Sequence, residues 1–218
     1  ALISLLRGND DVDVRQIAAF AIGEIESSLS ADALIEVLDD TKQPAEVRAR
    51  AVEALGKIAA ALTPAEEARR LSIGKVILNA LAAERKEGAL TESGVRNREL
   101  ELLGLTAVLR ARPADAGKVV MLFLSSADPR IRADAANTLA RLRAKDGVEE
   151  LRQLLVTDQL PIARANAARA LGAAEDKQAF DALLDRALHD DDLRVRVSAI
   201  RALGNLKDER AAEPLLLR

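Results

Sequence analysis

A short phrase that recurs six times most constrains how this chain can fold. Each copy has a branched apolar residue, an arginine, and small residues three, six and eight positions after the arginine. The six copies run over residues 11–25, 44–58, 93–105, 128–142, 160–174 and 192–206. Copies that recur at intervals of a few tens of residues, as these ranges do, are typical of stacked arrays. In such arrays each unit buries its apolar face only against its neighbours.

Composition favours an array made of helices. The chain has 218 residues, of which 49% are hydrophobic, yet three Phe are the only aromatic side chains. Small side chains must therefore fill the core, and alanine is the strongest helix former. An all-α fold follows, in which each repeat is a pair of antiparallel helices, A and B. Helix A carries the recurring phrase.

The repeats divide the chain as a single array over residues 1–218. Residues 1–10 form a partial repeat, and the following repeats run over 11–43, 44–90, 91–127, 128–159, 160–191 and 192–218. An insertion lies within residues 60–93, where we expect one long helix B over residues 64–88. That helix either protrudes as part of a binding face or forms a longer but inert hairpin.

Glycines recur inside the predicted A helices, where each costs about 1 kcal/mol relative to alanine. The positions are Gly23, Gly56, Gly104, Gly172 and Gly204, and Ala140 replaces glycine in the fourth copy. We expect another helix to approach closely at each of these glycines.

The pattern D-x-x-[VI]-R-x-x-A-x-x-A-L-G-x-[IL] resembles HEAT repeats, and most closely the short PBS-lyase HEAT-like type. The sixth copy matches it at Asp192, Val195, Arg196, Ala199, Ala202, Leu203 and Gly204. The third copy departs from it, with Glu99 and Leu102 where small residues are expected. The resemblance implies a right-handed α-solenoid (an α-α superhelix) of about six helical hairpins with partial repeats at both ends.

The resemblance also implies that the A helices line the convex side and the B helices the concave side. The outward positions of the B helices would be Asp32, Glu36, Asp39, Lys118, Gln153, Arg186 and His189. These residues run from acidic to more basic along the chain. They form either a partner-binding face or an ordinary solvated surface.

The recurring arginines are the most repeated polar feature of the sequence. They are Arg15, Arg48, Arg96, Arg132, Arg164 and Arg196. They form either an anion-binding stripe or a structural ladder, and the second reading is favoured because a guanidinium satisfies several acceptors at once. The expected acceptors are backbone carbonyls and the aspartates four residues earlier, namely Asp11, Asp128 and Asp192.

The sequence offers little for catalysis, and we expect no enzyme activity, cofactor or metal. Cysteine is absent, and His189 is the one histidine. The net charge of −3 and the lack of Trp and Tyr argue against nucleic-acid binding. No run of 18 apolar residues predicts a membrane span.

The function expected is a protein-interaction scaffold with an unidentified protein partner. The alternatives are a regulatory or structural arm of a larger multidomain enzyme, or a lyase-type subunit. The oligomeric state and the compartment are left open, with the cytoplasm favoured.

Overall fold

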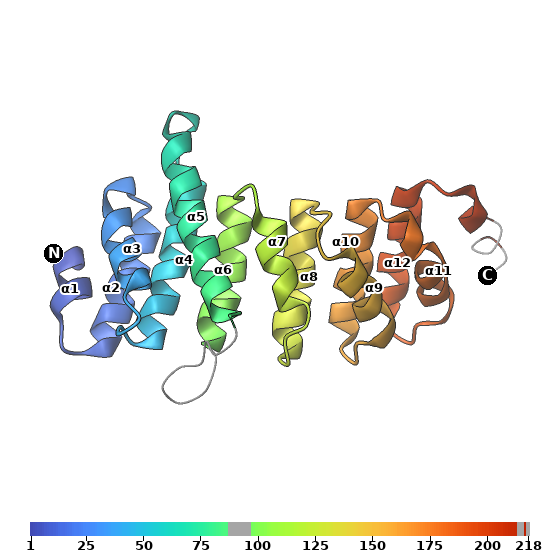
Figure 1. Ribbon diagram of the computed structural model, residues 1–218, viewed down its shortest axis with the longest axis horizontal. Helices are drawn as coiled ribbons and strands as arrows, with labels where there is room; N and C mark the ends of the chain where they lie inside the picture. The colour runs from blue at the N-terminus through green and yellow to red at the C-terminus, as the bar shows by residue number, and fades with distance from the viewer. Residues whose placement is uncertain (87–96, 213–215, 217–218) are drawn as a thin grey trace. The chain divides into compact units, whose positions relative to one another are not determined.

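The computed structural model describes residues 1–86, 97–212 and 216, and all regular structure in those residues is helical (Figure 1). The chain divides into two compact units, Ala1–Ala116 and Gly117–Arg218. Each unit is a stack of helical hairpins, and an all-α solenoid fold is thereby confirmed.

In unit 1 the A helices pack side by side, and each B helix packs against the A helix that follows it. The A helices are α2 (Val12–Ile25), α4 (Ala45–Ala61) and α6 (Arg98–Ala111). The B helices are α1 (Leu2–Gly8), α3 (Ala31–Asp39) and α5 (Glu67–Glu84), with the short 3₁₀ turns η1 (Ser28–Ser30) and η2 (Pro64–Glu66) preceding the last two.

Unit 2 repeats this arrangement. Its A helices are α8 (Pro129–Leu142), α10 (Pro161–Ala174) and α12 (Leu193–Leu206). Its B helices are α9 (Val148–Thr157) and α11 (Phe180–His189), together with α7 (Ala116–Val120), which begins at the unit boundary and continues into η3 (Met121–Phe123). The 3₁₀ turns η4 (Lys177–Ala179) and η5 (Glu209–Ala211) each follow an A helix.

Most A helices begin at a capping residue and end at a left-handed residue, and the spacing between the two is constant. The side chains of Asp11, Asn97, Asp128 and Asp192 accept hydrogen bonds from backbone N–H groups in the first turn, which are otherwise unsatisfied. In these four helices and in α10, whose N-cap is Leu160, the helix ends fifteen residues after the N-cap in a left-handed residue with φ between 50° and 59°. These residues are Glu26, Arg112, Arg143, Glu175 and Lys207. Only α4, which is longer, departs from this length.

These fixed positions correct the register of the third copy. Because α6 has its N-cap at Asn97 and its left-handed end at Arg112, the position four residues after the cap is Glu101. In the other five A helices that position holds the recurring arginine. Arg96, which was assigned to it, lies outside the described residues. The sequence pattern misled because a glycine, Gly104, follows Arg96 at the expected distance.

Three of the five glycines lie against an alanine of the next A helix. A Cβ at Gly23, Gly56 or Gly172 would lie 2.9, 2.6 or 2.7 Å from the Cα of Ala54, Ala107 or Ala202, respectively. These distances are shorter than van der Waals contact, so the close approach predicted there is confirmed. Gly104 is different, since it packs on the side chain of Leu81 in α5. At Gly204 the predicted approach was wrong for the described residues, since none of their atoms lies within 4 Å of an added Cβ.

The insertion lengthens both helices of one hairpin. The helix α4 has 17 residues and α5 has 18, whereas the other A helices have 14. The long helix B was predicted, but the extension of α4 was not, and residues 87–93 of the predicted insertion lie outside the described residues. Figure 1 shows the turn between α4 and α5 extending past the ends of the neighbouring helices of unit 1.

Candidate functional site

The arginines of unit 2 form a ladder within the fold. Arg132 and Arg164 each donate from Nη1 to a carbonyl six residues earlier, at 2.9 Å in both cases, and Arg196 does the same at 2.7 Å. Arg132 also donates from Nε to the carboxylate of Asp158 at 2.6 Å. Each arginine therefore ties its A helix to the end of the preceding B helix.

Asp190 is the most enclosed acceptor of this ladder. Its side chain is fully buried and accepts two hydrogen bonds from Arg164, each of 2.8 Å. Burial alone would raise the pKa of Asp190, but the bonds from Arg164 and from the backbone of Asp192 hold it below the usual value. The hydrogen bond to Asp190 in turn raises the pKa of Arg164. The pair stays ionised at neutral pH, and its charges are directed at each other.

Unit 1 contains a less regular version of the ladder. Arg15 donates to the side chain of Gln43 at 2.7 Å, and Arg48 donates to the carbonyl of Leu38 at 2.9 Å. At the equivalent position of α6, Glu101 forms an ion pair of 3.5 Å with Arg85. The side chains at the ladder positions thus bond to groups of the same fold in both units.

The acceptors expected for these arginines are only partly correct. Backbone carbonyls do accept from them, but the side chains of Asp11, Asp128 and Asp192 cap the first turns of their own A helices. A guanidinium hydrogen bond from Arg194 lowers the pKa of Asp192 to about 2. The carboxylates that bind Arg132 and Arg164 come from the end of the next B helix, 26 residues later.

The predicted outward residues of α3 lie at the surface of unit 1. Glu36 pairs with Arg7 of α1, and Asp32 pairs with Arg69 of α5 at 2.7 Å. Asp39, at the end of α3, is also exposed. Two of the three acidic side chains therefore have a cationic neighbour on an adjacent B helix, which offsets the acidity expected for this surface.

The predicted outward residues of unit 2 lie on three B helices. Lys118 of α7 and Gln153 of α9 are exposed. On α11, Arg186 is half-buried and lies 2.7 Å from Asp185, whose other oxygen is 3.1 Å from Nδ1 of His189. The acidic-to-basic trend was proposed along the whole chain and stays a prediction.

A groove of about 310 Å³ opens beside Gln153. Leu124 and Leu154 supply apolar surface, while Ser125, Gln153 and Thr157 supply hydroxyl and amide groups. Arg132, Glu150, Asp158 and Gln159 also line the groove. Sequence reasoning singled out Gln153 and Arg132 but not the other lining residues, because the groove depends on how η3 and α9 are placed. No short motif signals that placement.

A second, polar pocket of about 480 Å³ surrounds the histidine. His189, Asp190, Asp191 and Arg196 line it together with Leu188. The carboxylate of Asp190 binds Arg164, and Arg196 binds backbone carbonyls. The Asp190 carboxylate and the Arg196 guanidinium are therefore engaged within the ladder, while the imidazole of His189 pairs with Asp185.

Neither a cluster of metal ligands nor a membrane-spanning helix occurs among the described residues. In the ranges given above, no three metal-ligating side chains come together. Within the same ranges, none of the helices combines the length and the apolar character that crossing a bilayer requires.

The family model for HEAT repeats matches residues 1–71, 117–196 and 148–217. A search of curated protein sequences found no significant match.

Several solved structures share the fold. An engineered protein superposes with a TM-score of 0.65 and 22% identity, covering 94% of this chain and 95% of that one. A designed armadillo repeat protein in complex with a (KR)4 peptide gives 0.65 and 16%, covering 94% and 98%. An archaeal HEAT-like repeats protein from Thermococcus onnurineus NA1 gives 0.58 and 17%, covering 99% and 84%.

Proposed function

The chain belongs to the HEAT-repeat family, and from that premise we propose that it is a non-catalytic scaffold that holds a segment of a protein partner on its B helices. The observation that carries this proposal is the groove lined by Leu124, Ser125, Gln153, Leu154 and Thr157. Ser125, Gln153 and Thr157 are exposed, whereas Leu124 and Leu154 are largely buried, and Arg132 of the ladder also lines the groove.

The chemistry of the groove suits a short stretch of extended polypeptide. Its volume is near the lower end of the range for ligand pockets, about 300–1,000 Å³, which fits one or two side chains. The two leucines would contact an apolar side chain of the partner. The neighbouring amide and hydroxyl groups would hydrogen-bond its backbone, which must keep its polar groups satisfied on burial.

The B-helix surface of unit 1 would add charge recognition. Arg7–Glu36 and Asp32–Arg69 are exposed ion pairs, and such pairs contribute little to stability. A charged partner can therefore exchange with either member at low cost. The peptide-bound armadillo repeat protein of similar fold makes a peptide a sensible first probe.

We expect peptide-display selection against the whole chain to return binders that require the groove. Thr157→Lys places a long charged side chain beside Gln153 and should weaken the selected peptides about tenfold, equivalent to about 1.4 kcal/mol, in fluorescence polarisation. Thr106→Lys is the matched control. Both threonines are exposed, and the hydroxyl of each donates to the carbonyl four residues earlier.

Two results would contradict the proposal. One is a selection that yields no binder. The other is a set of binders whose affinity Thr157→Lys leaves unchanged.

A further inference from the structure

The groove beside Gln153 has one more carboxylate than it has cations. Its ionisable lining residues are Arg132, Glu150 and Asp158. Arg132 and Asp158 offset each other, because Nε of the arginine donates to the carboxylate at 2.6 Å. Glu150 is half-buried and, within the described part of unit 2, makes no hydrogen bond or ion pair. The lining therefore carries one uncompensated negative charge.

The arginine nearest to Glu150 along α9 is held elsewhere. Arg152 donates to the side chains of Asp176 at 3.1 Å and Gln178 at 2.8 Å, and it lies 3.7 Å from Glu149. Asp176 and Gln178 belong to the η4 turn and its cap, which contribute no residue to the groove. The carboxylate of Glu150 is thus left for a cation supplied from outside the chain.

The groove follows α9 along most of its length. Its lining on this helix and its end runs from Glu150 to Gln159. Glu150 and Leu154 are four residues apart, so they lie on the same side of the helix, about 6 Å apart along its axis. In an extended chain, residues two positions apart point to the same side and are separated by about 6.6 Å. An extended segment along α9 can therefore place alternate side chains at Glu150 and at Leu154.

The groove also contains a hydrogen-bond donor that the ladder does not use. Arg132 donates from Nε to Asp158 and from Nη1 to backbone carbonyls, but its Nη2 makes no hydrogen bond to a described residue. In the next rung, by contrast, Nη2 of Arg164 donates to Asp190 at 2.8 Å. Nη2 of Arg132 can therefore donate to a carbonyl oxygen of a bound chain.

We propose, on the premise of the function proposed above, that the segment held in this groove carries a lysine or arginine two residues from an apolar residue. The cation pairs with Glu150, and the apolar side chain packs on Leu124 and Leu154. A backbone carbonyl of the segment accepts a hydrogen bond from Nη2 of Arg132. Complementary charge of this kind sets which partner is accepted more than how tightly it binds.

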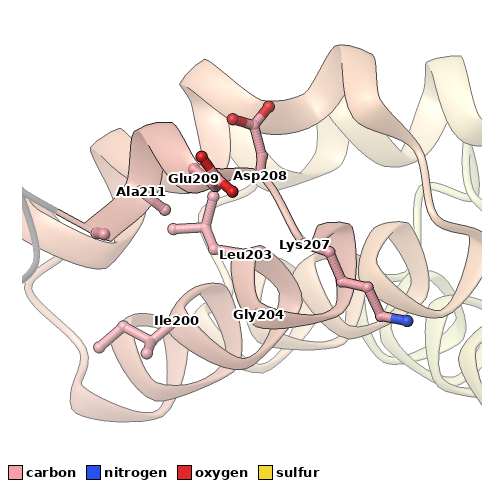
Figure 2. Close-up of a pocket in the computed structure, with 8 residues that line it drawn as sticks. Ile200, Leu203, Gly204, Lys207, Asp208, Glu209 and Ala211 are labelled. Carbon is pink, nitrogen blue, oxygen red and sulfur yellow. The ribbon is translucent and has the colours of Figure 1, made fainter.

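A pocket at the η5 turn gives no comparable preference. Figure 2 shows Lys207, Asp208 and Glu209 around this pocket of about 430 Å³. Side chains of both signs line it, and Asp208 is already paired with Arg210 at 2.7 Å. The preference for a cation is therefore assigned to the groove beside Gln153.

The probes for the test are peptides that display selection returns against the whole chain and that Thr157→Lys weakens, since these peptides occupy the groove. We expect them to share a basic residue two positions from an apolar one. Replacing that basic residue by glutamine should weaken binding about fivefold in fluorescence polarisation, the upper end for an exposed ion pair. Added salt should reduce the difference, because it screens the pair.

Variants of the protein assign the cation to Glu150. In Glu150→Gln, the same change in the peptide should cause no further loss, because the two charges act as a coupled pair. Glu150→Lys should reverse the preference, so that a peptide with glutamate at the basic position binds better than the original. Circular dichroism would verify the fold of each variant, since an acidic residue in the first turn also favours the helix.

Glu149→Gln is the matched control. The side chain of Glu149 is 88% exposed, and this residue precedes Glu150 on α9 but does not line the groove. The control should leave the affinity of the selected peptides within about twofold of the wild type, as expected for a charge that no bound group contacts.

The outcomes separate this inference from the proposed function. Groove-dependent peptides that bear no basic residue, or that lose equal affinity in the wild type and in Glu150→Gln when it is removed, would overturn the inference and leave the groove as a docking site. An effect of Glu149→Gln as large as that of Glu150→Gln would overturn it as well. A selection without any groove-dependent peptide would overturn both.

Discussion

The absence of a Cβ atom at glycine allows neighbouring A helices to pack closely in this protein. At Gly172 even one methyl group would lie 2.7 Å from the Cα of Ala202, and a backbone atom cannot rotate away as a side chain can. Gly204 stands at the same helix position, with no described atom within 4 Å of the added carbon. Substituting each of the two glycines by alanine therefore distinguishes the effect of packing, which applies only at Gly172, from the effect of helix propensity, which applies at both.

We expect Gly172→Ala and Gly204→Ala to change stability in opposite directions. Overpacking should make Gly172→Ala less stable, with a penalty toward the upper end of about 1–3 kcal/mol. Gly204→Ala should be neutral or more stable by up to about 1 kcal/mol, because alanine is the better helix former. Urea unfolding followed by circular dichroism would measure both. Equal effects would mean that α10 and α12 are not in close contact at Gly172.

Asp190 links stability to pH because its pKa is lowered in the folded chain. Its contribution is complete above the unfolded value of 3.8 and is lost as pH falls through the lower, folded pKa. Asp190→Asn removes the charge that Arg164 binds and should cost about 2–3 kcal/mol near neutral pH. The gap between wild type and variant should shrink as the pH drops below 3.8.

Urea midpoints measured across the acid range would test this dependence on pH. Asp191→Asn is the control, since that neighbouring carboxylate is exposed. It should leave the midpoint close to that of the wild type throughout. A gap for Asp190→Asn that stays constant with pH would show that packing, and not ionisation, explains its effect.

At the scale of the helices, the sequence predicted most of what the structure contains. The period located five of the six A helices. The register of α6 was wrong because Arg96 and Gly104 match the pattern by chance, while the structural positions hold Glu101 and Leu109. Only the cap at Asn97 and the end at Arg112 reveal the register, and both depend on backbone geometry.

The candidate groove was less predictable from sequence than the helices. Gln153 was identified because it lies on the outward side of its helix, but Leu124 and Ser125 directly follow the 3₁₀ turn η3. Periodicity specifies which face of a helix is buried. It does not specify how two helices from different repeats frame a groove, since that depends on side-chain packing across the joint.

The long α4–α5 hairpin begins its second helix with a capping box, and that element carries a prediction of its own. The carboxylate of Glu66 accepts hydrogen bonds from the backbone N–H and the hydroxyl of Thr63, at 3.2 and 3.0 Å. The bond from the Thr63 backbone lowers the pKa of Glu66. Thr63→Ala should reduce stability by about 1 kcal/mol, whereas Thr63→Ser should retain it.

Hydrogen exchange in the first turn of α5 would locate the Thr63→Ala effect. Protection should fall there before it falls in α4. Equal loss from Thr63→Ala and Thr63→Ser would show that the methyl group, not the hydroxyl, matters at this turn.

Across the whole molecule, stability is expected to be local. In a repeat array each hairpin gains its burial from its nearest neighbours, and here each of the two compact units has its own buried core. A defect placed in one joint should therefore spread through the helices that pack on it and stop short of those that do not. Ala202, which is 1% exposed beneath Gly172, is the place to introduce such a defect.

Ala202→Arg buries a charge without a partner and should open the joint between α10 and α12, because an unpaired buried charge is strongly destabilising. Native-state hydrogen exchange should show lost protection in α10, α11 and α12, while α2 and α4 keep theirs. Ala21→Arg is the matched control, since the same position is open on α2, and it should leave protection unchanged in both units. Uniform loss of protection in α2, α4 and α12 after Ala202→Arg would instead mean that the array unfolds as one cooperative body, and the description of its stability as a sum of neighbouring contacts would have to be given up.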